Sequence, residues 1–168
     1  MKVRRRAPEL SVRRALRDAK TLVPTDGSLT GLIEAIAREH RRTLVRVEVD
    51  LTGSALSGAW IPVDGVDYLL FPKDAPPTRA SAVVCHELAH VLLGHDPAIH
   101  LGGTLEKVQA ALAHLSPVTV ERMLSRTGYG DRQERNAEYF ATVLHTRLVS
   151  NRVAHQWRAA SLLSDRLR

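Results

Sequence analysis

The sequence predicts an α+β protein in which a small antiparallel sheet with a hairpin packs against a bundle of helices. Several segments repeat apolar residues at helical spacing, and one stretch between them alternates apolar and polar residues as a strand does. The chain has 168 residues, of which 44% are hydrophobic and 25% are charged, as in an ordinary globular protein. We therefore expect one domain over residues 1–168.

Two helices are expected before the sheet. Residues 8–23 offer a narrow apolar stripe that Pro24 ends, and residues 29–42 repeat apolar side chains at helical spacing after a turn. His40 falls on the stripe of the second helix, near its end. We therefore expect His40 at the edge of the core and not among metal ligands.

A strand and a hairpin follow these helices. Residues 45–51 alternate valine or leucine with charged residues, which predicts a strand with one solvated face. Asp64-Gly65 then separates the apolar runs 58–63 and 66–71, a strong signal for a hairpin closed by a two-residue turn. Because Pro62 has no N–H to donate to a neighbouring strand, its strand is expected at an edge of the sheet.

The motif His86-Glu87-Leu88-Ala89-His90 lies in an apolar run that predicts a helix over residues 78–94. On a helix, His86 and His90 stand one turn apart, so both imidazoles can bind one metal ion. The apolar residues fall on the opposite side, which predicts a core face and a site face. This zincin-like spacing is typical of zinc hydrolases, in which Zn²⁺ takes three protein ligands and a water. Glu87 is the candidate catalytic base.

Composition narrows the classes of function. The single cysteine, Cys85, excludes an internal disulfide, and we expect it buried on the core face of its helix. No apolar stretch is long enough to span a membrane and the first residues do not form a signal peptide, so we expect a cytoplasmic protein. The net charge is +6, with a basic first segment over 1–24 and a basic tail over 150–168. Direct nucleic-acid binding is not favoured, because no aromatic residues are interleaved with the early cations.

A third metal ligand must come from elsewhere in the chain. Short helices are expected over 105–115 and 117–126, followed by a long helix from Asp131 that can continue into the tail. Glu134 and Glu138 stand one turn apart on this long helix. One carboxylate of such a pair can bind metal while the other accepts the outer N–H of a liganding histidine. We predict Glu134 as the third ligand and Glu138 as the orienting residue.

Two alternatives to this ligand set remain open. Asp96 stands ten residues after His86, where metzincin-like proteases place a third ligand, and His95 is beside it. Those enzymes carry a glycine seven residues after the first histidine, whereas Gly94 is eight residues after it here. The other alternative is that the two glutamates form an ordinary carboxylate pair on a solvated helix.

The motifs around His86-Glu87-Leu88-Ala89-His90 and Glu134-x-x-Ala137-Glu138-x-Phe140-Ala141, with the hairpin before them, resemble the ImmA/IrrE family of metallopeptidases, particularly its short actinobacterial form. The resemblance covers about residues 30–149. It implies that His86, His90 and Glu134 bind zinc and that Glu87 is catalytic. It further implies a helix-turn-helix repressor of mobile-element or stress genes as the substrate.

We therefore predict a zinc-dependent endopeptidase, with Tyr129, Tyr139 and His145 as candidate oxyanion donors. The exposed edge strand could hold an extended substrate. A second class is a non-catalytic regulatory module that keeps its zinc and docks a transcription factor. A third is a metal-dependent nuclease, because residues 86–96 are faintly similar to bacterial rRNA-maturation enzymes. Those enzymes carry a third histidine where this chain has Asp96.

Overall fold

The computed structural model describes residues 12–53, 56–95, 108, 110, 113 and 130–166. The α+β class is confirmed by the helices and strands in these ranges. In chain order they are α1 (Val12–Leu22), α2 (Leu29–Glu39), β1 (Thr43–Val49), β2 (Ala59–Val63), β3 (Val66–Pro72), α3 (Pro77–Leu93) and α6 (Asp131–Arg166). The helices predicted over 105–115 and 117–126 lie outside the described residues, apart from three single positions. Asp96 and Tyr129 also lie outside them.

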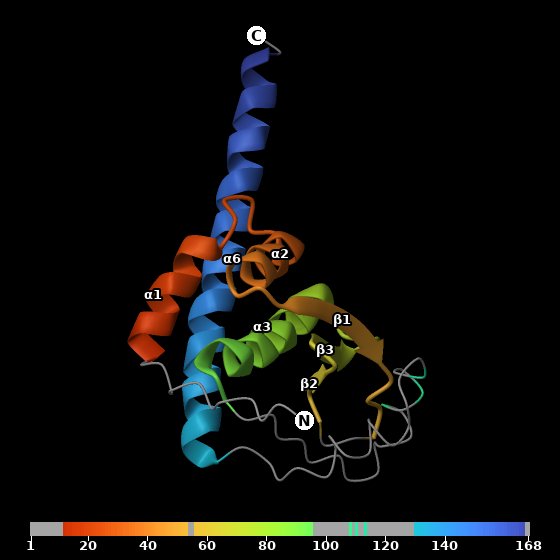
Figure 1. Cartoon of the computed structure of the whole chain (residues 1–168). Coiled ribbons are helices and arrows are strands. Elements are labelled where there is room, and N and C mark those ends of the chain that lie inside the picture. The colour runs from red at the N-terminus through yellow and green to blue at the C-terminus, as the bar shows by residue number, and fades with distance from the viewer. Residues whose placement is uncertain are drawn as a thin grey trace.

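The three strands form one sheet in the order β1-β3-β2 (Figure 1). β2 pairs with β3 in antiparallel orientation, but β1 pairs with β3 in parallel orientation. The prediction of an antiparallel sheet was therefore wrong for one of its two pairings. The reason is that β3, the most continuously buried strand, lies at the centre of the sheet. After β1 the chain first forms β2 at the other edge, and the hairpin then places β3 between β1 and β2.

The predicted hairpin is confirmed. Val63 faces Val66 across the turn, and both turn residues have positive φ, 46° at Asp64 and 89° at Gly65. That backbone is typical of a two-residue turn whose twist matches the strands. β2 has β3 as its neighbour in the sheet and lies at an edge, as the missing N–H of Pro62 predicted.

Apolar side chains cover both faces of the sheet. On one face Trp60, Leu69 and Phe71 join the larger core, which includes residues of all four described helices. On the other face Ile61, Tyr68 and Leu70 belong to a second, smaller cluster that also contains Val108. The first face matters most here, because it places β2 and β3 directly against α3.

α3 begins with a proline in its first turn and ends at Gly94, whose φ of 70° is the left-handed conformation that glycine adopts without strain. The helix predicted over 78–94 is thus confirmed. The expected division into a core face and an open site face was wrong, since Glu87 and His90 are both buried. The sheet packs on one side of α3 and α6 packs on another, so nearly the whole helix is enclosed.

α6 is one continuous helix of 36 residues that includes the basic tail as far as Arg166. Its first half is anchored by buried side chains at Ala137, Phe140, Ala141, Leu144 and Leu148. Farther along, Asn151 Nδ2 donates to the Pro24 carbonyl at 2.8 Å, and Arg152 Nη2 donates to the Gly27 carbonyl at 3.1 Å. Beyond these contacts the helix extends away from the rest of the fold (Figure 1).

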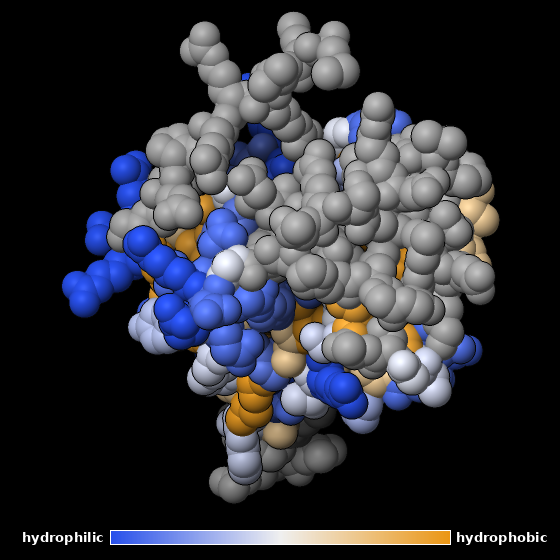
Figure 2. Space-filling view, turned by 90° about the horizontal axis from the view of Figure 1, so that it is seen from below, coloured by the Kyte–Doolittle hydropathy of each residue, from blue (hydrophilic) through white to orange (hydrophobic). Residues whose placement is uncertain are grey.

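Of the two N-terminal helices, α1 packs against α6, α2 and α3, and α2 also contacts β1. α2 ends at Glu39, so His40 is the exposed C-cap and not the core-edge residue that the helical stripe predicted. Figure 2 shows hydrophilic residues gathered on the side of the molecule where α1 lies. The exposed cations of α1 are Arg13, Arg14, Arg17 and Lys20. Within the described residues, no helix is both long and apolar enough to cross a membrane.

Candidate metal centre

α3 brings two imidazoles together. His86 and His90 are one helical turn apart, and their Nε2 atoms lie 3.0 Å from each other. The rings meet edge to face, with centroids 4.8 Å apart. The His86 side chain keeps 22% of its surface exposed and His90 keeps none. His90 is therefore the inner histidine of the pair, and His86 is the one that reaches solvent.

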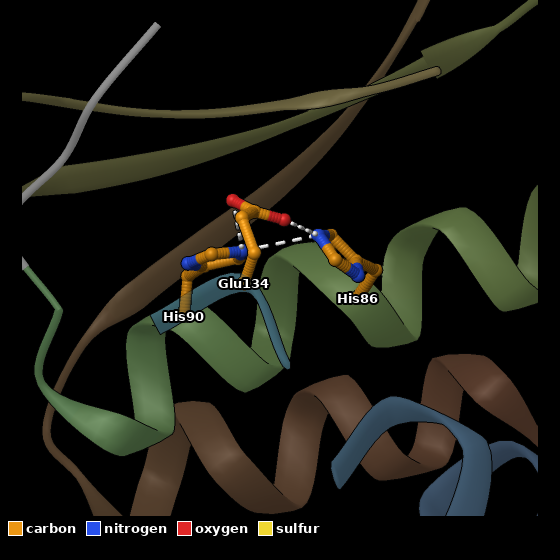
Figure 3. A group of neighbouring side chains, drawn as sticks. All are labelled: His86, His90 and Glu134. Atoms are coloured by element: carbon orange, nitrogen blue, oxygen red, sulfur yellow. Dashed lines mark hydrogen bonds and ion pairs between the residues drawn. The ribbon is translucent and has the colours of Figure 1, made fainter. Parts of the chain in front are cut away.

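α6 supplies the third group from its first turn. Glu134 Oε2 lies 3.4 Å from His86 Nε2, and Glu134 Oε1 lies 3.6 Å from His90 Nε2. Figure 3 shows the two rings rising from α3 toward this carboxylate. Among the described residues, these three side chains form a group whose ligand atoms could hold a metal ion. The core contacts of Phe140 and its neighbours hold the start of α6 in this place.

The spacing of the three donors fits a small tetrahedral ion. Zinc bonds of about 2.0 to 2.1 Å to nitrogen or oxygen set neighbouring ligand atoms about 3.3 to 3.4 Å apart. The separations of 3.0, 3.4 and 3.6 Å lie around that value. Two imidazoles and one carboxylate are also donors that zinc accepts in catalytic sites. The residues present therefore fit Zn²⁺.

The outer nitrogens of both histidines have partners. His86 Nδ1 lies 3.3 Å from Glu138 Oε2, and His90 Nδ1 lies 2.9 Å from His95 Nδ1. If both outer nitrogens carry the proton, the two Nε2 atoms present lone pairs to each other at 3.0 Å. A cation between them removes that repulsion, which is a second reason why this donor set suits a metal.

Burial keeps His90 in the form that a metal requires. Its pKa falls to about 2, first because burial penalises the imidazolium and then because His86 and His95 are close. At neutral pH the ring is therefore neutral and its nitrogens are available as donors.

Glu87 lies inside the protein, only 4% exposed, between α3 and β2. The backbone N–H of Trp60 donates to its carboxylate. Gly58 allows this close approach, because a Cβ there would lie 2.4 Å from Val83 Cγ1 and 3.0 Å from Glu87 Oε1. Burial and the charge of Glu134 raise the pKa of Glu87 to about 8, against the lowering effect of the Trp60 N–H.

The buried carboxylate of Asp67 fixes the indole of Trp60. Its Nε1 donates to Asp67 Oδ1 at 2.9 Å, and Arg42 Nε binds Asp67 Oδ2 at 2.6 Å. The Arg42 guanidinium also lies 5.8 Å from the centre of the Trp60 ring. These contacts hold the middle of β2 above α3 and thereby set the N–H that Glu87 accepts.

The remaining candidate donors are not brought to the cluster. Tyr139 is 59% exposed and stands five residues after Glu134, about 140° around the helix from it. His145 stands eleven residues after Glu134, about 16 Å farther along the helix axis. Tyr129 lies outside the described residues.

Sequence reasoning missed two features of the site. One is the contact of His95 with His90, and the other is the hydrogen bond from the Trp60 N–H to Glu87. The first had a signal, because the glycine that ends α3 turns the next residue back over the helix end. The second depends on how β2 lies over α3, which no local pattern reveals. Comparison of the chain with protein-family models, with curated proteins and with solved structures gave no match.

Proposed function

We propose that the protein is a zinc-dependent endopeptidase. The observation that carries the proposal is the convergence of His86, His90 and Glu134, from two helices far apart in sequence, beside the buried carboxyl of Glu87. The resemblance of these motifs to the ImmA/IrrE metallopeptidases supports the same activity. The donor set and the partly exposed side chains of His86 and Glu134 suit a site that a substrate must enter.

Each residue has a role in this proposal. Zinc, when bound, would activate water and polarise a peptide carbonyl. His86, His90 and Glu134 hold the metal, and Glu138 orients His86 through its outer nitrogen. Glu87 would take a proton and return it to the leaving amine, a role that needs its carboxylate form, whereas without the metal a pKa of about 8 leaves it protonated at neutral pH. A bound cation opposes the rise of that pKa and strengthens Glu87 as the proton acceptor.

The substrate would be an extended segment of another protein, laid along β2. In the hairpin, the hydrogen-bonding groups of Ile61 and Val63 face β3, so those of Trp60 and Pro62 point to the opposite edge of β2. The expected exposure of this edge strand was wrong, since all its residues but Pro62 are buried. The outward Trp60 N–H is the one that meets Glu87, which places this edge beside the catalytic carboxyl. A peptide can add to such an edge by backbone hydrogen bonds.

The proposed partner is a helix-turn-helix repressor, and its cleavage would release mobile-element or stress genes. The test incubates the purified protein with the helix-turn-helix proteins encoded near its gene, with zinc or with a chelator. We expect cleavage that zinc supports, that Glu87→Gln abolishes and that Glu48→Gln, at an exposed position of β1, leaves unchanged. Cleavage that persists in Glu87→Gln would contradict the mechanism.

A second candidate is a non-catalytic module that keeps its zinc and docks a transcription factor. The enclosure of Glu87 under the Trp60 N–H favours it, since a carboxylate held in this way is less free to reach a water. Protein that retains zinc and binds the repressor without cutting it would support this candidate over the first.

A further inference from the structure

His95 contacts His90 on the side of the ring that faces away from His86 and Glu134. Gly94 adopts the left-handed conformation at the end of α3 and turns the chain back on itself. The His95 N–H then donates to the His90 carbonyl at 3.1 Å. The same turn brings the His95 side chain, which is buried, to 2.9 Å from His90, Nδ1 to Nδ1.

The two nitrogens of His90 face different neighbours. Its Nε2 lies near His86 and Glu134, and its Nδ1 lies against His95. Since the two nitrogens of one ring point in divergent directions, His95 cannot share an ion with His90 Nε2. Its effect on the metal must pass through the His90 ring, which makes it a positioning residue and not a ligand.

We propose that His95 accepts the Nδ1 proton of His90 and thereby fixes the tautomer that presents the Nε2 lone pair to the metal. The inference rests on the metal centre of the proposed function. Inside the protein Nδ1 needs an acceptor at this distance, because His90 is fully buried and water does not solvate it. His95, which the left-handed turn at Gly94 places beside His90, provides that acceptor.

The choice of an imidazole follows from the charges around it. Glu87 and Glu134 already place two carboxyl groups near each other. A third carboxylate behind His90 would add a buried negative charge at further cost, whereas a neutral imidazole adds none. On the open side the partner of His86 is Glu138, whose side chain is 74% exposed and whose charge water can solvate. The two histidines thus take different partners according to their burial.

Two substitutions separate this role from simple packing. His95→Phe fills nearly the volume of the ring but has no acceptor, and His95→Asn keeps an acceptor close to the place of Nδ1 but loses volume. We expect His95→Phe to weaken zinc binding about 10- to 100-fold, the range for such outer partners, and His95→Asn to retain most of the affinity. A packing role predicts the reverse order.

The measurement is the zinc dissociation constant by competition with a coloured chelator. His155→Ala, at an exposed histidine of α6, is the matched control and should bind zinc as the wild type does. Thermal unfolding in chelator checks that each variant folds. If His95→Phe does not fold, long-range ¹H–¹⁵N spectra of the wild type in chelator decide, and we expect the proton of His90 on Nδ1 even without zinc.

The inference is overturned if folded His95→Phe binds zinc as tightly as the wild type, if His95→Asn loses as much affinity as His95→Phe, or if the His90 proton lies on Nε2. These failures leave the proposed function intact, because the wild type still binds zinc. Wild-type protein that binds no zinc would overturn the metal centre itself and this inference with it.

Discussion

α3 and α6 both supply the candidate metal centre, but they hold their residues in opposite ways. α3 is enclosed between the sheet and α6, so His90 has no exposed surface and its outer nitrogen meets another buried side chain. α6 buries one stripe and leaves Glu134 45% and Glu138 74% exposed at its open end. The comparison indicates that α3 provides the fixed half of the site and α6 the half that solvent and substrate reach.

The largest effect should be seen at Cys85, which reports how tightly α3 is enclosed. The thiol is fully buried and burial raises its pKa to about 12. Because only the thiolate reacts, we expect a thiol reagent at pH 8 to label the folded protein at least about 1000-fold more slowly than the protein in urea. Labelling of the native protein at the urea rate would show that α3 is not enclosed.

The next effect tests how α6 is anchored. Phe140→Ala removes the largest of the fully buried side chains under the start of α6, which should lower the free energy of unfolding by about 3 to 5 kcal/mol. Tyr139→Ala is the matched control, since that neighbouring aromatic ring is exposed and its loss should change stability by less than about 0.5 kcal/mol. Urea unfolding measures both. Equal losses would mean that the two faces of α6 do not differ as described.

Zinc itself should couple the two helices. At a free concentration 100 times its dissociation constant, it should stabilise the folded protein by about 2.7 kcal/mol. We expect His90→Ala to abolish this stabilisation and Glu134→Gln to reduce it, because water can replace part of a half-exposed ligand but not a buried one. Thermal unfolding with zinc and with chelator measures the difference. A greater loss of zinc stabilisation in Glu134→Gln than in His90→Ala would contradict the assignment of α3 as the fixed half of the site.

The smallest effect is expected at Glu138. Its contact with His86 Nδ1 is at the surface, where water can accept the same proton. Glu138→Gln should therefore weaken zinc binding by less than about 10-fold, below the loss expected for His95→Phe. Chelator competition on the two variants side by side gives the ratio. A larger loss for Glu138→Gln would contradict the assignment of the buried partner as the more important one.

Much of the frame of the site could be predicted from local patterns. The glycine after Leu93 marked the end of α3, the Asp64-Gly65 pair marked the hairpin, and Pro62 marked an edge strand. The continuity of α6 had a signal as well, because no proline or glycine interrupts residues 131–166. Such features depend on the backbone preferences of a few adjacent residues.

The features that sequence reasoning missed depend on contacts between distant segments. The parallel pairing of β1 with β3 follows from which strand is best buried at the centre of the sheet, and alternation within β1 does not encode it. The enclosure of the motif helix likewise follows from where α6 packs. Even the contact of His95, five residues after His90, required the αL turn that closes α3.

The most direct test of the central claim is X-ray absorption spectroscopy of the zinc-loaded protein. We expect one zinc per chain, with two imidazole nitrogens and at least one carboxylate oxygen at about 2.0 to 2.2 Å, and a changed oxygen shell in Glu134→Gln. Zinc bound without Glu134, or through sulfur, would contradict the account, as would protein that binds no zinc at all.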